Sequence, residues 1–154
     1  MREDDTHYMK MALMEARRAY ALAEVPIGAI IIDEEGELVA TGYNRREIDN
    51  DATAHAEMIA IKSACEKLNR WRLTGLTLYV TIEPCPMCAG AIIMSRLSRV
   101  VYGGYDVKAG AVDSLFNVLS HPGLNHQPDV TAGVLAEECA DLMKKFFRER
   151  RQAK

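Results

Sequence analysis

The chain has 154 residues, of which 49% are hydrophobic and 27% charged, and its formal net charge is −3. This length suits one domain, residues 1–154, which can bury a core without disulfides. The acidic average gives no support to nucleic-acid binding through overall charge, so any basic surface must come from local clustering. From the charged N-terminus and the lack of a run of about 18 apolar residues we expect neither a signal peptide nor a membrane span. We expect a cytoplasmic protein whose four cysteines are thiols or metal ligands.

The N-terminal part of the chain predicts a helix followed by a hairpin. Apolar residues recur every three or four positions, at Met9, Leu13, Ala16 and Tyr20. This spacing predicts a helix over about 5–23. The β-branched run 27–32, a turn at 33–36 and a second run at 37–42 predict an antiparallel hairpin.

The middle of the chain alternates helices with apolar strands. Thr53 is a candidate cap for a helix that runs to about Leu68. The run 76–82 is the clearest strand, and a helix over 86–96 and a strand over 99–104 follow it. Strands that are apolar throughout imply a sheet that is covered on both faces.

The C-terminal part is irregular before it ends in a helix. Glycines and prolines mark loops around a short helix near 114–119, and a strand near 130–134 precedes a helix over 136–150. Together these elements predict an α/β fold, a three-layer α/β/α sandwich with a mixed central sheet of about five strands.

One histidine and two cysteines form the strongest chemical signal. His55 and the pair Cys85 and Cys88 are ligands suited to Zn²⁺. Because Cys85 precedes Pro86, which favours the first position of a helix, the thiols should lie where the helix dipole favours the thiolate form that binds metal. We predict one zinc ion per chain.

Glu57 stands two residues after His55, which on a helix points the two side chains in different directions. The histidine can therefore bind metal while the glutamate reaches a water molecule or the substrate. In a hydrolytic deamination Glu57 would take a proton from water, pass it to a ring nitrogen and help the amine depart. This role requires a pKa that partial burial raises.

Alternatives remain for each motif. A lone His-x-Glu is usually a pair of exposed residues with no functional role, and a Cys-Pro-x-Cys can be a redox site or a buried pair of thiols. If the zinc were structural, a fourth ligand such as Glu57 or Cys65 would be needed. Cys65 and Cys139 otherwise suit core packing. The loop histidines His121 and His126 either serve their loop or touch substrate.

The segment 144–151 combines cations with two adjacent aromatic residues. It can be an amphipathic terminal helix with a solvated basic face, or a surface that contacts phosphates and stacks an unpaired base. Composition alone favours the first interpretation. One of Phe146 and Phe147 must still anchor the helix in the core.

Several segments carry a resemblance to a known family. His55-Ala56-Glu57 and Pro84-Cys85-Pro86-Met87-Cys88 match the signature of the zinc-dependent cytidine and deoxycytidylate deaminase superfamily. The segments that extend the match are Glu24-Val25-Pro26-Ile27-Gly28-Ala29, Tyr43-Asn44-Arg45, Asp106-Val107-Lys108-Ala109-Gly110-Ala111 and Leu124-Asn125-His126. With them, nearly the whole chain resembles the bacterial tRNA-specific adenosine deaminases.

The resemblance implies conversion of adenosine to inosine at the wobble position of a tRNA anticodon, by a homodimer. It also implies that His55, Cys85 and Cys88 hold zinc and that Glu57 shuttles protons. Asn44 should hydrogen-bond an extruded purine and Ile27 should form an apolar wall. Asp106 and the loop that leads to His121 should meet the neighbouring nucleotides of an anticodon stem-loop. The resemblance also favours the second interpretation of the segment 144–151, with Phe147, Arg148 and Arg151 as contacts.

The chain departs from the family pattern at two positions. Ala52 stands where the family commonly has proline, and Asp113 stands where it has glycine. The conformation of the loop around Asp113 therefore transfers less safely than the zinc chemistry.

Three functions are compatible with the sequence. The leading one is a tRNA adenosine deaminase. The second is a deaminase of free bases or nucleosides, such as guanine or cytidine. The third is an RNA-binding module with a structural zinc.

Overall fold

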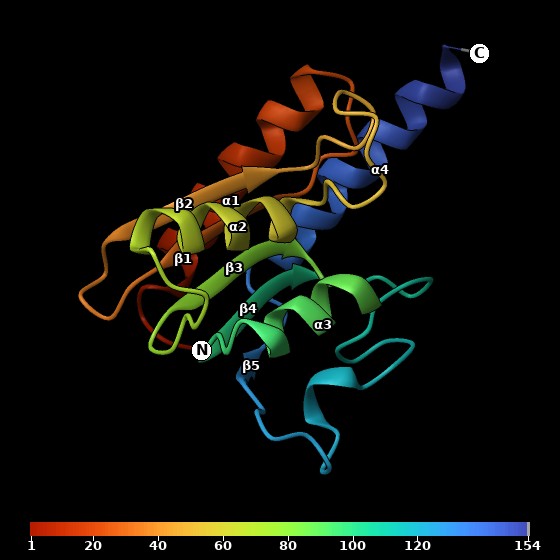
Figure 1. Cartoon of the computed structure of the whole chain (residues 1–154). Helices are drawn as coiled ribbons and strands as arrows, with labels where there is room; N and C mark the ends of the chain where they lie inside the picture. The colour runs from red at the N-terminus through yellow and green to blue at the C-terminus, as the bar shows by residue number, and fades with distance from the viewer. Residues whose placement is uncertain (154) are drawn as a thin grey trace.

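In the computed structural model, which describes residues 1–153, a five-stranded sheet lies between two layers of helices (Figure 1). The strands are β1 (Gly28–Ile32), β2 (Leu38–Tyr43), β3 (Thr77–Ile82), β4 (Arg99–Gly104) and β5 (Asp129–Thr131). They lie in the order β2-β1-β3-β4-β5. β1 is antiparallel to both β2 and β3, whereas β3, β4 and β5 are parallel. The predicted mixed sheet is confirmed.

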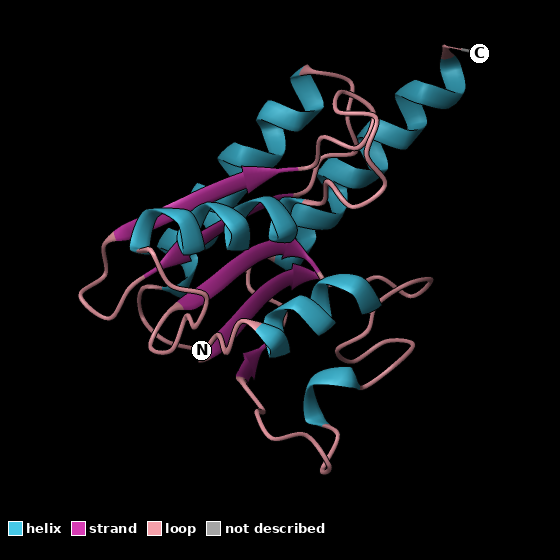
Figure 2. Ribbon diagram, viewed as in Figure 1, coloured by secondary structure: helices cyan, strands magenta, loops and turns pink. Residues whose placement is uncertain are grey.

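The helices cover both faces of this sheet (Figures 1 and 2). One face carries α1 (Asp5–Ala21) and α4 (Ala136–Gln152), and the other carries α2 (Ala56–Leu68) and α3 (Pro86–Met94). Because successive strand residues point to opposite faces, Ile30 packs in the core layer beneath α1 while Ile31 packs in the layer beneath α2. Both faces are therefore apolar, and the three-layer prediction holds. Across residues 1–153, every helix falls short of the length and apolar character that a bilayer span demands.

Two glycines let helices approach the hairpin closely. A Cβ atom at Gly28 would lie 2.2 Å from the carbonyl oxygen of Ala12 in α1. A Cβ atom at Gly42 would lie 2.4 Å from the carbonyl oxygen of Ala56, the first residue of α2. The second contact sets the start of α2, and hence His55, against β2.

The start of α2 differs from the predicted one. The hydroxyl of Thr53 donates a hydrogen bond to Asp51 at 2.7 Å and belongs to the preceding turn. His55 has extended backbone angles (φ −79°, ψ 153°) and occupies the N-cap position. The prediction that Thr53 caps this helix is therefore wrong, and the metal-ligand candidate itself stands at the helix start.

The irregular segment after β4 is also less helical than predicted. In place of a helix near 114–119, the chain forms only a 3-10 turn, η1 (Val118–Ser120). The amides of Leu115, Phe116 and Val118 donate to carbonyl oxygens five to seven residues earlier, at Gly110 and Ala111, so the four-residue spacing of helical hydrogen bonds does not form there. β5 ends at Thr131 and not near Val134, because Gly133 takes a positive φ of 82°.

Candidate active site

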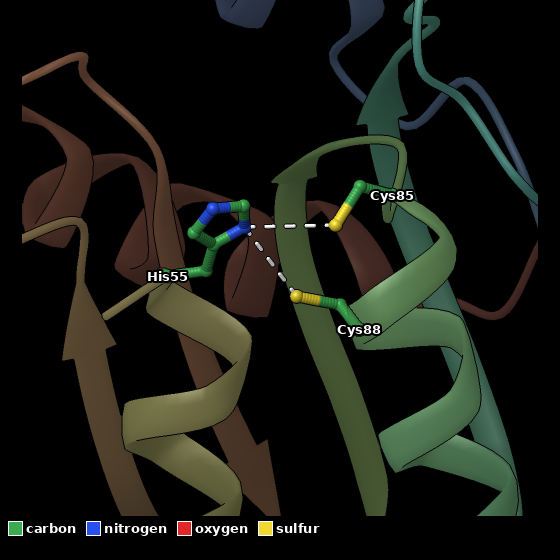
Figure 3. Close-up of side chains that lie close together, drawn as sticks. All are labelled: His55, Cys85 and Cys88. Atoms are coloured by element: carbon green, nitrogen blue, oxygen red, sulfur yellow. Dashed lines mark hydrogen bonds between the residues drawn. The ribbon is translucent and has the colours of Figure 1, made fainter. Parts of the chain in front are cut away.

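Three candidate ligands come together where α2 and α3 begin (Figure 3). Nδ1 of His55 lies 3.6 Å from Sγ of Cys85 and 3.6 Å from Sγ of Cys88. His55 and Cys85 are the N-cap residues of their helices, and Pro86 takes the first position of α3 as predicted. His55 and Cys85 are half-buried and Cys88 is buried, so the group is shielded but open on one side.

The geometry of this group fits zinc. With usual zinc–nitrogen and zinc–sulfur bond lengths, two ligands on a tetrahedral ion stand about 3.5 Å apart, which the observed separations match. Among residues 1–153, the only such group of histidine, cysteine and acidic side chains contains these three residues. Neither Glu57 nor Cys65 joins it. A set of three protein ligands is typical of a catalytic zinc site and does not complete a structural one.

The electrostatics of the group favour a metal. Hydrogen bonding from Cys88 lowers the pKa of the Cys85 thiol to about 4, and His55 adds to the effect. The contact with Cys85 raises the pKa of His55. The N-terminus of α3 also favours a thiolate at this point. The hydrogen bond to Cys85, together with burial, raises the pKa of the Cys88 thiol, so of the two thiols only Cys85 is favoured as a thiolate before a metal binds.

Glu57 lies in the first turn of α2 and is 4% exposed. Burial raises the pKa of this carboxyl to about 7, and the charge of Cys85 acts in the same direction. A group with this pKa can both accept and donate a proton near neutral pH. Glu57 is thus suited to the predicted proton transfer.

A cavity of about 270 Å³ opens above these residues. Its wall includes the candidates Ile27, Asn44, His55, Glu57, Cys85, Asp106 and Phe147. Side chains from six separate segments of the chain therefore meet at one site. The wall also includes Val25, Arg46, Glu83 and Met143, which sequence reasoning missed. Arg46 lies two residues after Asn44 and Glu83 two before Cys85, so proximity to the motifs was the available signal.

The polar residues of the wall are held by their own loops. The side-chain amide of Asn44, which is 6% exposed, donates to the carbonyl of Val25 at 3.2 Å and accepts from the backbone amide of Arg46 at 3.2 Å. Oδ1 of Asp106 accepts from the amides of Lys108 and Ala109, both at 3.1 Å. These bonds fix the two side chains before any ligand binds.

A second, strongly basic cavity of about 610 Å³ adjoins the first through Met143 and Phe147. The remaining residues of its wall are Lys108, Lys144, Arg150 and Arg151. Phe146 is buried against Tyr20 while Phe147 is 41% exposed, which confirms that one of the two aromatics anchors α4. The acidic chain therefore carries a local cluster of cations beside the candidate zinc site.

Two predicted contact residues lie elsewhere. His121 is exposed, and its Nδ1 accepts a hydrogen bond from the amide of Gly123 at 3.0 Å. Arg148 is exposed on α4. Neither residue lines the two cavities. Both remain predictions for a larger ligand that extends beyond them.

Asp113 does not strain the loop it occupies. The backbone at this position has no positive φ, so the glycine of the family pattern is not required for conformational reasons. Its carboxylate accepts a hydrogen bond from the buried hydroxyl of Tyr102. The substitution therefore adds a contact between the loop and β4.

Comparison with known proteins agrees with this site. Residues 2–104 match the family model of the cytidine and deoxycytidylate deaminase zinc-binding region. The tRNA-specific adenosine deaminase of Bacillus subtilis (strain 168) is 49% identical over 150 residues, which cover 97% of this chain and 92% of that protein. The corresponding enzyme of Haemophilus influenzae is 44% identical over 152 residues, which cover 99% of this chain and 88% of that enzyme.

Solved structures show the same architecture. One comes from studies of A-to-I editing by tRNA:A34 deaminases at the wobble position of transfer RNA; it has a TM-score of 0.85 and 47% identity, and the match covers 89% of this chain and 99% of that one. The guanine deaminase of Nitrosomonas europaea has a TM-score of 0.81 and 25% identity, and the match covers 92% of this chain and 83% of that one.

Proposed function

The chain belongs to the family of the cytidine and deoxycytidylate deaminase zinc-binding region and to its branch of tRNA-specific adenosine deaminases, and from this premise we propose that it converts adenosine to inosine at the wobble position of a tRNA anticodon. The observation that carries the proposal is the convergence of three zinc ligands and buried Glu57 on a cavity that adjoins a basic surface. The substrate would be met in the cytoplasm, by one deaminase domain spanning residues 1–154.

His55, Cys85 and Cys88 would hold the zinc. When bound there, zinc lowers the pKa of a coordinated water so that it can act as a nucleophile near neutral pH. Glu57 would take a proton from the attacking water and deliver it to the ring nitrogen next to C6. It would then carry a second proton to the departing amine, so that adenosine and water give inosine and ammonia.

The cavity walls suit an extruded purine. Ile27 offers an apolar face, and Asn44 offers the second N–H and the second oxygen lone pair of an amide whose other donor and acceptor sites are bonded to its own loop. Phe147 stands at the junction of the two cavities, where it can stack a neighbouring base. Asp106 would contact the nucleotide beside the target adenosine. His121 would contact only RNA that extends past the cavity.

The test is incubation of the protein with an anticodon stem-loop that carries adenosine at the wobble position. We expect inosine at that position alone. Glu57→Ala should keep one zinc per chain and lose turnover by at least about 100-fold, because proton transfer is removed while the ligands stay. Loss of zinc from Glu57→Ala would instead support a structural metal.

A guanine deaminase is the second candidate, because a solved guanine deaminase shares the fold. Such an enzyme would not need the basic cavity beside the site. The same assay with free guanine separates the two functions. Turnover of guanine together with an inert stem-loop would refute the leading proposal.

The basic cavity provides a separate test of RNA binding. Replacing Arg150 and Arg151 with alanine should weaken stem-loop binding and lower its salt dependence by about one ion per lost phosphate contact, without loss of zinc. Arg148→Ala, outside the cavity, reports whether the RNA path continues along α4. Unchanged affinity of the double variant at low salt would remove this surface from the site.

A homodimer is supported by an apolar groove between α2 and α3. The residues that form it are Ile61, Cys65, Trp71, Ala91, Met94 and Ser95. Trp71 is 57% and Met94 72% exposed, which is unusual for such large apolar side chains. A second copy could cover both through a two-fold interface. Met94→Glu should then shift the mass measured by light scattering from dimer to monomer; an unchanged mass would argue against this face.

A further inference from the structure

The carboxylate of Glu83 has no part in the proposed chemistry, yet it is 3% exposed and lies directly between β3 and the segment that carries Cys85. We propose that Glu83 is a positioning residue whose carboxylate holds the loop 105–114 in place as one wall of the catalytic cavity. The inference rests on the proposed function, since it concerns how the same cavity receives its substrate.

Five donors from this one loop converge on the carboxylate. Oε1 accepts from the backbone amide of Asp106 at 3.1 Å and from the hydroxyl of Ser114. Oε2 accepts from the backbone amides of Val112 at 3.1 Å, Asp113 at 2.8 Å and Ser114 at 2.9 Å. The two ends of the loop are thus tied to the two oxygens of a single side chain.

The loop places three residues that the substrate would meet. Asp106 and Ala109 line the catalytic cavity, and Lys108 lines the basic cavity beside it. The loop has no strand or helix to order it. Its position therefore depends on the Glu83 carboxylate, and movement of that group would displace the wall in both cavities.

Gly110 gives independent evidence that the loop is fitted around this carboxylate. A Cβ atom at position 110 would lie 2.4 Å from the carboxyl carbon of Glu83 and 2.5 Å from its Oε1. Gly110 does not have a positive φ, so the need for glycine here is one of space and not of backbone conformation. Any larger residue would push the carboxylate or the loop away.

A carboxylate suits this task better than an amide. Two carboxylate oxygens offer about four acceptor sites, whereas a glutamine offers one acceptor oxygen and an NH₂ group that can only donate. Glu83→Gln would place that NH₂ against backbone N–H groups and leave some of them buried without a partner. The substitution keeps the size of the side chain, so it tests the hydrogen bonds and not the packing.

The experiment compares Glu83→Gln with the unmodified protein as zinc-loaded enzyme. Zinc content, kcat and KM for the anticodon stem-loop, and hydrogen exchange of the amides of residues 112–114 are measured. We expect one zinc per chain, a KM raised at least 10-fold, kcat within about 3-fold, and exchange of these amides at least 10-fold faster. KM should carry the effect because the loop borders the substrate and does not touch the reacting atoms.

Asp5→Asn is the matched control. Asp5 is also a buried carboxylate with several donors, but it lies at the amino ends of β3 and β4, opposite the catalytic cavity. This variant should lose stability and keep its KM. Gly110→Ala is the second variant: it keeps the glutamate but displaces the carboxylate, and should reproduce the higher KM.

The outcomes are distinguishable. An inert unmodified protein would defeat the proposed function and not the positioning role, which the exchange data then decide. An unchanged KM with unchanged exchange in an active Glu83→Gln variant would overturn the inference, as would an equal rise of KM in Asp5→Asn. If Glu83→Gln does not fold, Gly110→Ala decides alone: a raised KM with zinc retained supports the inference, and a normal KM overturns it.

Discussion

Replacing Asp5 with asparagine should destabilise the fold by an amount that depends on pH. Asp5 is fully buried and accepts hydrogen bonds from both terminal nitrogens of Arg99, each at 2.7 Å, and from the hydroxyl of Tyr79 at 2.7 Å. Arg99 is itself 5% exposed. Removing the carboxylate leaves this cation buried without a counter-charge, which typically costs about 3–5 kcal/mol.

The pH dependence follows from the pKa of the carboxyl. Burial by itself would raise this pKa, but the bonds from Arg99, the amide of Arg2 and Tyr79 outweigh it and lower the pKa from 3.8 to about 2. A lowered pKa stabilises the folded state by about 2 kcal/mol at neutral pH. This contribution is present above about pH 4 and is lost as the pH falls towards 2, with about 1 kcal/mol left at pH 3.

The assay is denaturant unfolding of both chains at pH 7, 5, 4 and 3. The difference in free energy of unfolding between the two chains should be constant from pH 7 to pH 5 and then shrink by about 1 kcal/mol by pH 3. Loss of zinc at acid pH affects both chains alike and cancels in the difference. A difference that does not change with pH would refute the reasoning, because it would show that Asp5 titrates alike in the folded and unfolded chains.

Three further predictions concern packing, a loop and the metal. Gly28→Ala should lower the free energy of unfolding by about 3 kcal/mol or more in denaturant titration, because its Cβ would meet the backbone of Ala12. Gly90→Ala, which has open space around it, is the control and should be neutral or stabilising by up to about 1 kcal/mol. Glu24→Gln should lower the free energy of unfolding by about 1–3 kcal/mol, since the buried carboxylate accepts a hydrogen bond from the amide of Ile48 at 2.7 Å. An unchanged free energy of unfolding would mean that the loop after β2 keeps its conformation without this bond. Chelation should lower the melting temperature, and zinc but not magnesium should restore it; a chelator without effect would argue against metal at this site.

Sequence alone identified the chemical groups of the site because their identity and spacing are local. The pattern of His55, Glu57 and the pair Cys85 and Cys88 predicts zinc ligands and a proton carrier before the fold is known. The order of helices and strands was equally accessible, since it follows from the periodicity of apolar residues. Pro86 even indicated that the thiols stand at a helix start.

The tertiary structure decided how those groups are supported. Which residues share a cavity depends on β1, β3 and β4 lying side by side, and no local pattern reveals that Arg46 and Met143 face the same space. The predicted helix near 114–119 is absent because the loop folds around the Glu83 carboxylate, about thirty residues earlier in the chain, and the amides of Leu115 and Phe116 donate to Gly110 and not to carbonyls four residues back. A hydrogen bond to a distant side chain leaves no periodic trace in the sequence. The sequence therefore determined the chemistry of the zinc site, and the packing of distant segments decided the shape of the cavity in which that chemistry takes place.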